Sequence, residues 1–131
     1  MLDATSIQTT CPEVSGLCLA PAGDGLLVGN QWEPVMLMRF SPEEGVLSRR
    51  ELTFTTEIAD LCYDPVRDVL WIADSESHIL RLCTPEGDQL ATYPMPFADN
   101  GEGICVDHGH SCIWIGDDTT SRIYHVRFKD L

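Results

Sequence analysis

One pattern of apolar residues occurs three times along the 131-residue chain, and it constrains the fold more than any other feature. Each copy holds two apolar segments whose matching positions lie nine residues apart, at Leu17 and Leu26, Leu61 and Leu70, and Ile104 and Ile113. The first two copies are 44 residues apart and the last two are 43 residues apart. Repetition at a fixed period of this length predicts stacked copies of one supersecondary unit.

Each copy also contains further segments that are typical of β-strands. A third apolar segment follows at 35–40, 79–83 and 123–128, and a more polar fourth segment follows at 47–54 and 89–95. The segments are short, rich in β-branched and aromatic residues, and bounded by Gly, Pro, Asp or Ser. Four short strands in about 40–45 residues are typical of a β-propeller blade. We therefore predict an all-β chain of three four-stranded blades, at about 13–56, 57–100 and 101–131.

The third copy has no fourth segment, and we expect residues 5–10 at the other end of the chain to act as its counterpart. Closed propellers contain about four to eight blades, so three blades leave two apolar faces open. Two arrangements would cover these faces: a homodimer that completes a six-bladed ring, or further blades in a longer chain. The N-terminal strand favours the homodimer.

Two short motifs carry a resemblance to a known family. One is Glu102-Gly103-Ile104, and the other is the Trp-Ile-x-Asp sequence at 71–74 and 114–117. Over about residues 13–128 the chain resembles the SdiA-regulated propellers, relatives of the NHL-repeat propellers. The resemblance implies a propeller fold and, in many members, an export signal or a membrane anchor. This chain is shorter than full members of the family, which carry more blades.

The chain is strongly acidic, with a formal net charge of −13. Such a surface repels phosphate backbones, so we do not expect a nucleic-acid partner. Strands alternate in direction, so the loops that enter each first strand share one face with the loops after each second strand. The polar and aromatic residues of that face are Glu13, Ser15, Asn30, Trp32, Glu33, Glu57, Asp60, Asp74, Glu76, Asp99, Asn100, Glu102, Asp117 and Asp118. This mouth of the channel is expected to attract cations or basic partners.

Six of these residues are our candidates for ligand binding: Glu102, Asp60, Trp32, Asn30, Asp74 and Asp117. Trp32 lies in a loop, where it could stack on a ligand or cover the edge of the first blade. Asn30, Asp74 and Asp117 occupy one repeated position. A group that occurs in every blade is typical of a structural turn that bonds its own backbone, so these three residues also have a structural interpretation.

Glu102 is the candidate metal ligand. In the related gluconolactonase-like propellers this position supplies metal ligands from several blades, whereas its equivalents here are Ser15 and Ala59. The resemblance therefore implies at most a divalent cation such as Ca²⁺, whose sites need several oxygen ligands. The sequence His108-Gly109-His110 resembles a metal tract, but the repeat places it in a hairpin turn.

The function that the sequence favours is a non-catalytic propeller scaffold that binds a ligand or partner at its acidic face. No catalytic motif of a hydrolase, metalloprotease or nucleotide-binding enzyme is present. The alternative is a metal-dependent, lactonase-like hydrolase that uses Glu102 and a divalent cation. No apolar run reaches the roughly 18–20 residues of a membrane span. The lack of a signal peptide and the six cysteines expected to be free thiols predict a cytoplasmic protein, whereas the family resemblance implies export.

Overall fold

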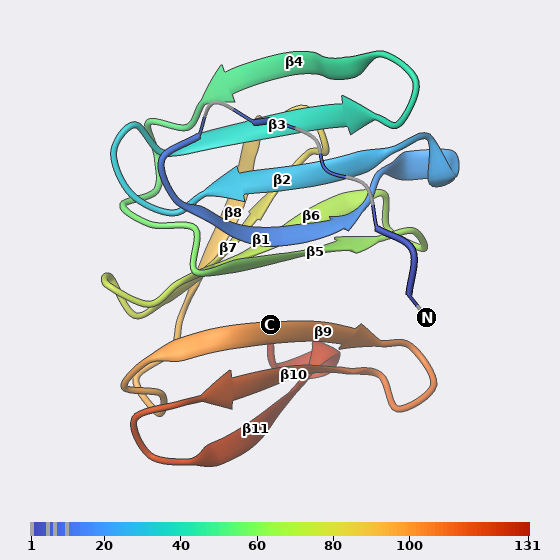
Figure 1. The fold of residues 1–131 in the computed structure, drawn as a ribbon. Helices are drawn as coiled ribbons and strands as arrows, with labels where there is room; N and C mark the ends of the chain where they lie inside the picture. The colour runs from blue at the N-terminus through green and yellow to red at the C-terminus, as the bar shows by residue number, and fades with distance from the viewer. Residues whose placement is uncertain (1, 5, 7, 10) are drawn as a thin grey trace.

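Eleven β-strands form three antiparallel sheets in the computed structural model, which describes residues 2–4, 6, 8–9 and 11–131 (Figure 1). The first sheet has the order β1 (Val14–Leu19), β2 (Leu26–Asn30), β3 (Met36–Ser41) and β4 (Gly45–Glu51). The second has the order β5 (Asp60–Asp64), β6 (Val69–Asp74), β7 (Ile79–Cys83) and β8 (Gln89–Pro94). The third contains β9 (Gly101–Asp107), β10 (Cys112–Asp117) and β11 (Arg122–Arg127). The prediction of an all-β chain is confirmed.

The three sheets are stacked through their first strands. β5 lies between β1 and β9 and contacts both, and the three strands run in the same direction (Figure 1). Two single-turn 3₁₀ helices, η1 (Pro21–Gly23) and η2 (Phe128–Asp130), are the helical elements of the described residues. None of those residues forms a helix long and apolar enough to cross a bilayer.

Alternating side chains of each middle strand fill the spaces between the sheets. Leu27 on β2 points towards the second sheet, and Leu70 and Ile72 on β6 point back towards the first. Trp71, between those two residues, points instead towards the third sheet, where it meets the core that contains Ile113 and Ile115. The period of two in a β-strand produces this division, so the middle strand β6 is buried on both faces.

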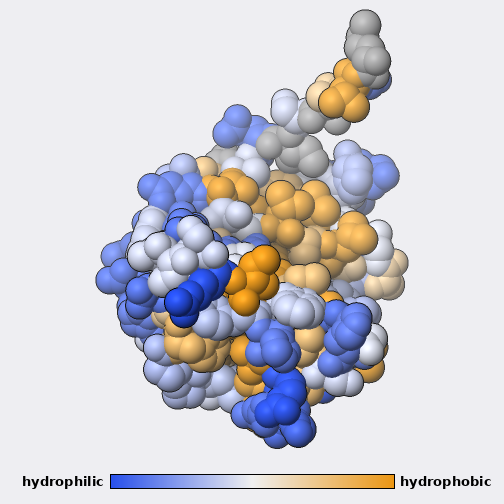
Figure 2. All heavy atoms as spheres, turned by 90° about the horizontal axis from the view of Figure 1, so that it is seen from below, coloured by the Kyte–Doolittle hydropathy of each residue, from blue (hydrophilic) through white to orange (hydrophobic). Residues whose placement is uncertain are grey.

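The two outer faces of the stack differ from each other. On the first sheet Val28, Met38 and Phe40 are buried, and Cys11 packs against them. On the third sheet Trp114 is 37% exposed and Ile123 is 76% exposed. Hydrophobic atoms form patches on the face seen from below (Figure 2).

A hydrogen bond from His108 to the buried Asp64 fixes the third sheet to the second at the end opposite the acidic loops. His108 Nε2 lies 2.7 Å from Asp64 Oδ1, and the Asp64 side chain is fully buried. Burial acts to raise the pKa of Asp64, but hydrogen bonds from Arg67, His108 and Trp71 outweigh it and hold the pKa below its ordinary value. His108 thus lies in the predicted turn and also connects two sheets.

Two details differ from the sequence-based expectation. The fourth strand of the first sheet, predicted at 47–54, is Gly45–Glu51, because Leu52 leaves the sheet and is buried in the core between the first and second sheets. The outer strand predicted at 5–10 falls partly on residues 5, 7 and 10, which lie outside the described residues. The third sheet contains three described strands. All six cysteines are free thiols.

Candidate functional site

The repeated polar residue at the end of each second strand holds the loop that enters the same sheet. Asn30 Oδ1 accepts a hydrogen bond from the Glu13 backbone N–H at 2.9 Å. Asp74 Oδ2 accepts from the N–H of Thr56 at 3.0 Å, and Asp117 Oδ2 accepts from the N–H of Asp99 at 2.8 Å. The same bond therefore recurs in all three sheets and brings their loops to one end of the stack.

These three residues are buried and fully engaged. Asn30 is 1% exposed, Asp74 0% and Asp117 3%. Asp74 also accepts from Thr55 Oγ1 at 2.9 Å and from Arg81 Nε at 2.9 Å. Each residue thus has the structural role expected of a repeated turn residue, and the structure buries the three side chains behind the loops.

Hydrogen bonds to Asp117 determine its charge state. Burial acts to raise the pKa of this carboxyl, but hydrogen bonds from the backbone N–H groups of Asp99, Thr120 and Thr119 hold the pKa below its ordinary value. The carboxylate form is therefore favoured, and it accepts hydrogen bonds from the loops on both sides of it.

Asp60 connects two neighbouring sheets. Its Oδ2 accepts from the Ile104 N–H on β9 at 2.9 Å, and its Oδ1 accepts from the Leu61 N–H at 2.8 Å. Burial raises the pKa of Asp60 in spite of these two hydrogen bonds. The side chain therefore joins β5 to β9, and it is not among the residues that line the pocket described next.

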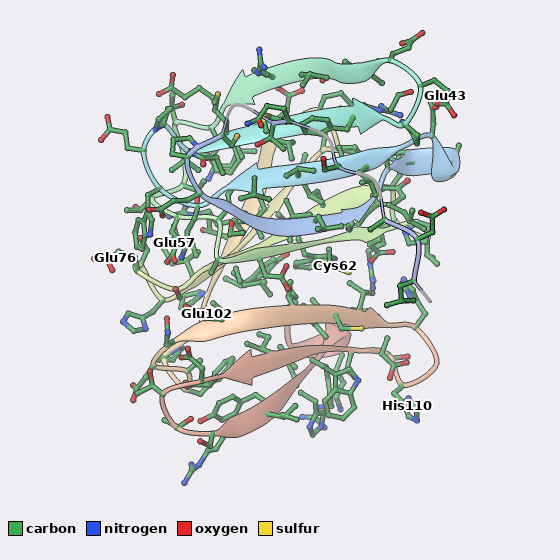
Figure 3. All side chains as sticks on the ribbon, in the orientation of Figure 1. Glu43, Glu57, Cys62, Glu76, Glu102 and His110 are labelled. Atoms are coloured by element: carbon green, nitrogen blue, oxygen red, sulfur yellow. The ribbon has the colours of Figure 1, made fainter. Side chains whose placement is uncertain are left out.

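The loops of all three sheets meet around a pocket of about 300 Å³, which we call the acidic pocket. It is lined by Gln31 and Trp32 of the first sheet, Glu57, Ser75, Glu76 and His78 of the second, and Asp99, Asn100 and Glu102 before and on β9. Glu57, Glu76 and Glu102 lie at the same end of the stack, opposite Glu43 and His110 (Figure 3). Of the six predicted ligand residues, the structure brings Trp32 and Glu102 together here.

Glu57 forms the floor of the acidic pocket and is 1% exposed. Its Oε1 accepts from Gln31 Nε2 at 2.7 Å, and its Oε2 accepts from Ser75 Oγ at 2.6 Å and from the Glu76 N–H at 2.9 Å. A buried carboxylate is stable only with such partners. Glu57 therefore ties the first sheet to the second beneath the rim of the pocket.

The rim carries three exposed carboxylates, Glu76, Asp99 and Glu102. Glu102 Oε1 accepts from Asn100 Nδ2 at 3.1 Å, and the same amide donates to Asp118 Oδ1 at 2.6 Å. Trp32 is 39% exposed, and Asn30 Nδ2 donates to the Trp32 carbonyl at 2.9 Å. The indole therefore lies on a fixed loop beside a negative rim.

His78 adds a proton acceptor to the pocket. Its Nδ1 lies 3.0 Å from the carbonyl oxygen of Ala98. A carbonyl can only accept, so this nitrogen carries the proton and Nε2 is the acceptor in the neutral ring. No sequence motif points to His78 as a pocket residue. Gln31 and Ser75 could have been found, because each directly follows the repeated residue Asn30 or Asp74.

The described part of the chain holds no group of three His, Cys, Asp or Glu side chains placed to bind one metal ion. The carboxylates of the acidic pocket are therefore spread around its rim and floor rather than gathered at Glu102. Glu102 supplies one carboxylate, and hard cations need several oxygen ligands.

Comparisons with known proteins bear on the fold. No protein-family model and no curated protein matches the chain. Among solved structures, it is similar to a protein of unknown function from Bacteroides caccae, with a TM-score of 0.59 and 15% sequence identity. The similarity covers 91% of this chain and 47% of the other, so this chain spans about half the length of that protein. At this identity the similarity shows a shared fold alone.

Proposed function

We propose that the chain is a β-propeller scaffold that binds a cationic group, on a small molecule or a basic protein partner, in the acidic pocket. The three sheets are its blades, and two chains complete a six-bladed ring. The short motifs around Glu102 and Trp114 support a relationship to the SdiA-regulated propellers. The proposed activity is binding without catalysis.

The lining of the acidic pocket is the observation that carries this proposal. It contains four carboxylates, those of Glu57, Glu76, Asp99 and Glu102, and no lysine or arginine among its described residues. The carboxylate of Glu57 is occupied by its own partners, whereas the three rim carboxylates are exposed and can face a ligand. An organic cation can pair with these groups and also pack against the indole of Trp32, a contact worth about 0.5–2 kcal/mol.

Binding of arginine amide, measured by tryptophan fluorescence, tests the proposal. Citrulline amide is the matched ligand control, because it has nearly the same shape and no charge. We expect arginine amide to bind in a saturable manner, more weakly as NaCl is added, because salt screens exposed charges. Glu76→Gln and Glu102→Gln are each expected to weaken binding about two- to fivefold, the range for one exposed ion pair.

Glu43→Gln is the matched control variant, because Glu43 lies at the opposite end of the stack (Figure 3). It removes the same charge from the chain and should leave binding unchanged. Equal binding of citrulline amide, or an equal loss in the Glu43 variant, would show that the acidic pocket does not recognise a cation. The metal-dependent alternative is tested on the same Glu102 variant, since that hydrolase would lose Ca²⁺ or Mn²⁺ binding.

A further inference from the structure

Adjacent sheets meet at a pair of glycines on the first sheet. Gly16 of β1 and Gly29 of β2 are register partners. A Cβ added to Gly16 would lie 2.9 Å from the backbone nitrogen of Leu61, and one added to Gly29 would lie 2.6 Å from Cγ2 of Ile58. Contacts this short cannot be accommodated without movement, so the two glycines form a notch that the chain around Ile58 and Leu61 fills.

The third sheet carries the same notch, and there it is empty. Gly103 of β9 and Gly116 of β10 are register partners at the equivalent positions. An added Cβ at either glycine meets no atom within 4 Å among the described residues. Exposed Cys105 and Trp114 lie beside this notch on the same two strands.

The first sheet carries the group that would fill such a notch. Val14 and Leu17 lie 44 residues before Ile58 and Leu61, at the same places in the repeat. Ile58 and Leu61 are 0% and 2% exposed, whereas Val14 and Leu17 are 46% and 60% exposed. The chain therefore presents a filling group at one end of the stack and an unfilled notch at the other.

We propose that a second copy of this chain places Val14 and Leu17 in the notch formed by Gly103 and Gly116. Two such contacts, related by a two-fold axis, close a ring of two chains. The contact continues the packing that already joins the first sheet to the second. It lies on the inner strands, because Cys11 already packs over the outer part of the first sheet, at Met38 and Phe40. This inference rests on the blade arrangement proposed above.

Sedimentation equilibrium of the full chain and its variants tests this inference. We expect a dimer for the native sequence. Leu17→Glu should give a monomer, because it places a charge in the apolar contact. Gly116→Glu should do the same by filling the notch, while the single chain still folds because the added Cβ meets no atom of the described residues within 4 Å. In both variants the dimer dissociation constant should rise at least tenfold.

Two controls add the same charge elsewhere. Val66→Glu changes a residue that is 72% exposed in a turn, and Thr92→Glu changes an exposed strand residue of β8. Both variants should remain dimeric. Cys105 gives a second measurement: its alkylation, followed by peptide mass spectrometry, should be slower in the native dimer than in the Leu17 variant.

A monomeric native chain, an open polymer, or a dimer that neither variant weakens would overturn the inference. Circular dichroism and urea unfolding of each variant show whether a lost dimer reflects lost folding. Arginine amide binding on the same samples separates this inference from the proposed function. The acidic pocket lies within one chain, so a monomeric variant should still bind the cation.

Discussion

Asp74→Ala is expected to lower the free energy of unfolding by about 3–5 kcal/mol, the usual cost of removing one partner of a buried ion pair. The substitution leaves Arg81, which is 8% exposed, without the carboxylate that accepts its Nε–H at 2.9 Å. It also frees the hydroxyl of Thr55 and the N–H of Thr56. Since small domains have about 5–15 kcal/mol in total, much of the chain should be unfolded at 37 °C.

Urea unfolding followed by circular dichroism measures this loss, with Asp117→Ala as the matched comparison. Asp117 holds the equivalent loop, but its hydrogen bonds come from backbone N–H groups and include no arginine. Its replacement should therefore cost less. A second comparison, the double variant Asp74→Asn with Arg81→Met, should recover part of the stability because no charge is left unpaired. Equal losses in the two alanine variants would show that the ion pair with Arg81 is not the cause.

Gly29→Val should destabilise the single chain by about 1–3 kcal/mol or more, the range for overpacking a filled core. The reason is the 2.6 Å approach of an added Cβ to Cγ2 of Ile58. Gly116→Val makes the same change at the equivalent position of the third sheet, where an added Cβ has no atom of the described residues within 4 Å. Its effect on the single chain should be within about 0.5 kcal/mol, as for most surface substitutions.

Both glycine variants are compared by urea unfolding at a protein concentration low enough to keep the chains monomeric. The contrast between them isolates the packing of the second sheet on the first, because both residues are glycines in register-paired strands. If the two valines cost the same, the second sheet does not pack on the first in the manner described.

Much of the fold could be predicted because the repeat fixes both strand spacing and side-chain direction. The alignment makes Leu27, Trp71 and Trp114 equivalent, and Leu27 and Trp71 each point towards the next sheet of the stack. Trp71 is therefore buried between two sheets, whereas Trp114 lies on the last sheet and faces outwards. The end of β4 could not be predicted in this way. Leu52 looks like a strand residue, and only the neighbouring sheet shows that it belongs to the core.

The candidate site was predicted less well. The conformation of a loop depends on its contacts with neighbouring sheets and not on a periodic sequence pattern. Glu102 and Trp32 were both predicted at the acidic mouth of the channel, and both line the acidic pocket. From the sequence, Asp60 is an equally plausible ligand-binding carboxylate. In the structure its side chain accepts a hydrogen bond from the N–H of Ile104, 44 residues later. The equivalent of His78 in the third copy is Ser121, so the histidine itself is not part of the repeated pattern. The place of its side chain at the pocket depends on the carbonyl of Ala98.

We propose above that loops from all three sheets form one cation-binding pocket. A ¹H–¹⁵N NMR titration with arginine amide tests it, with the Trp32 indole N–H, the Ser75 amide and the Asn100 amide each reporting a different loop. We expect all three signals to shift with one shared, saturating dependence on ligand concentration. Signals that shift with different dependences, in only one loop, or without saturation would contradict the claim.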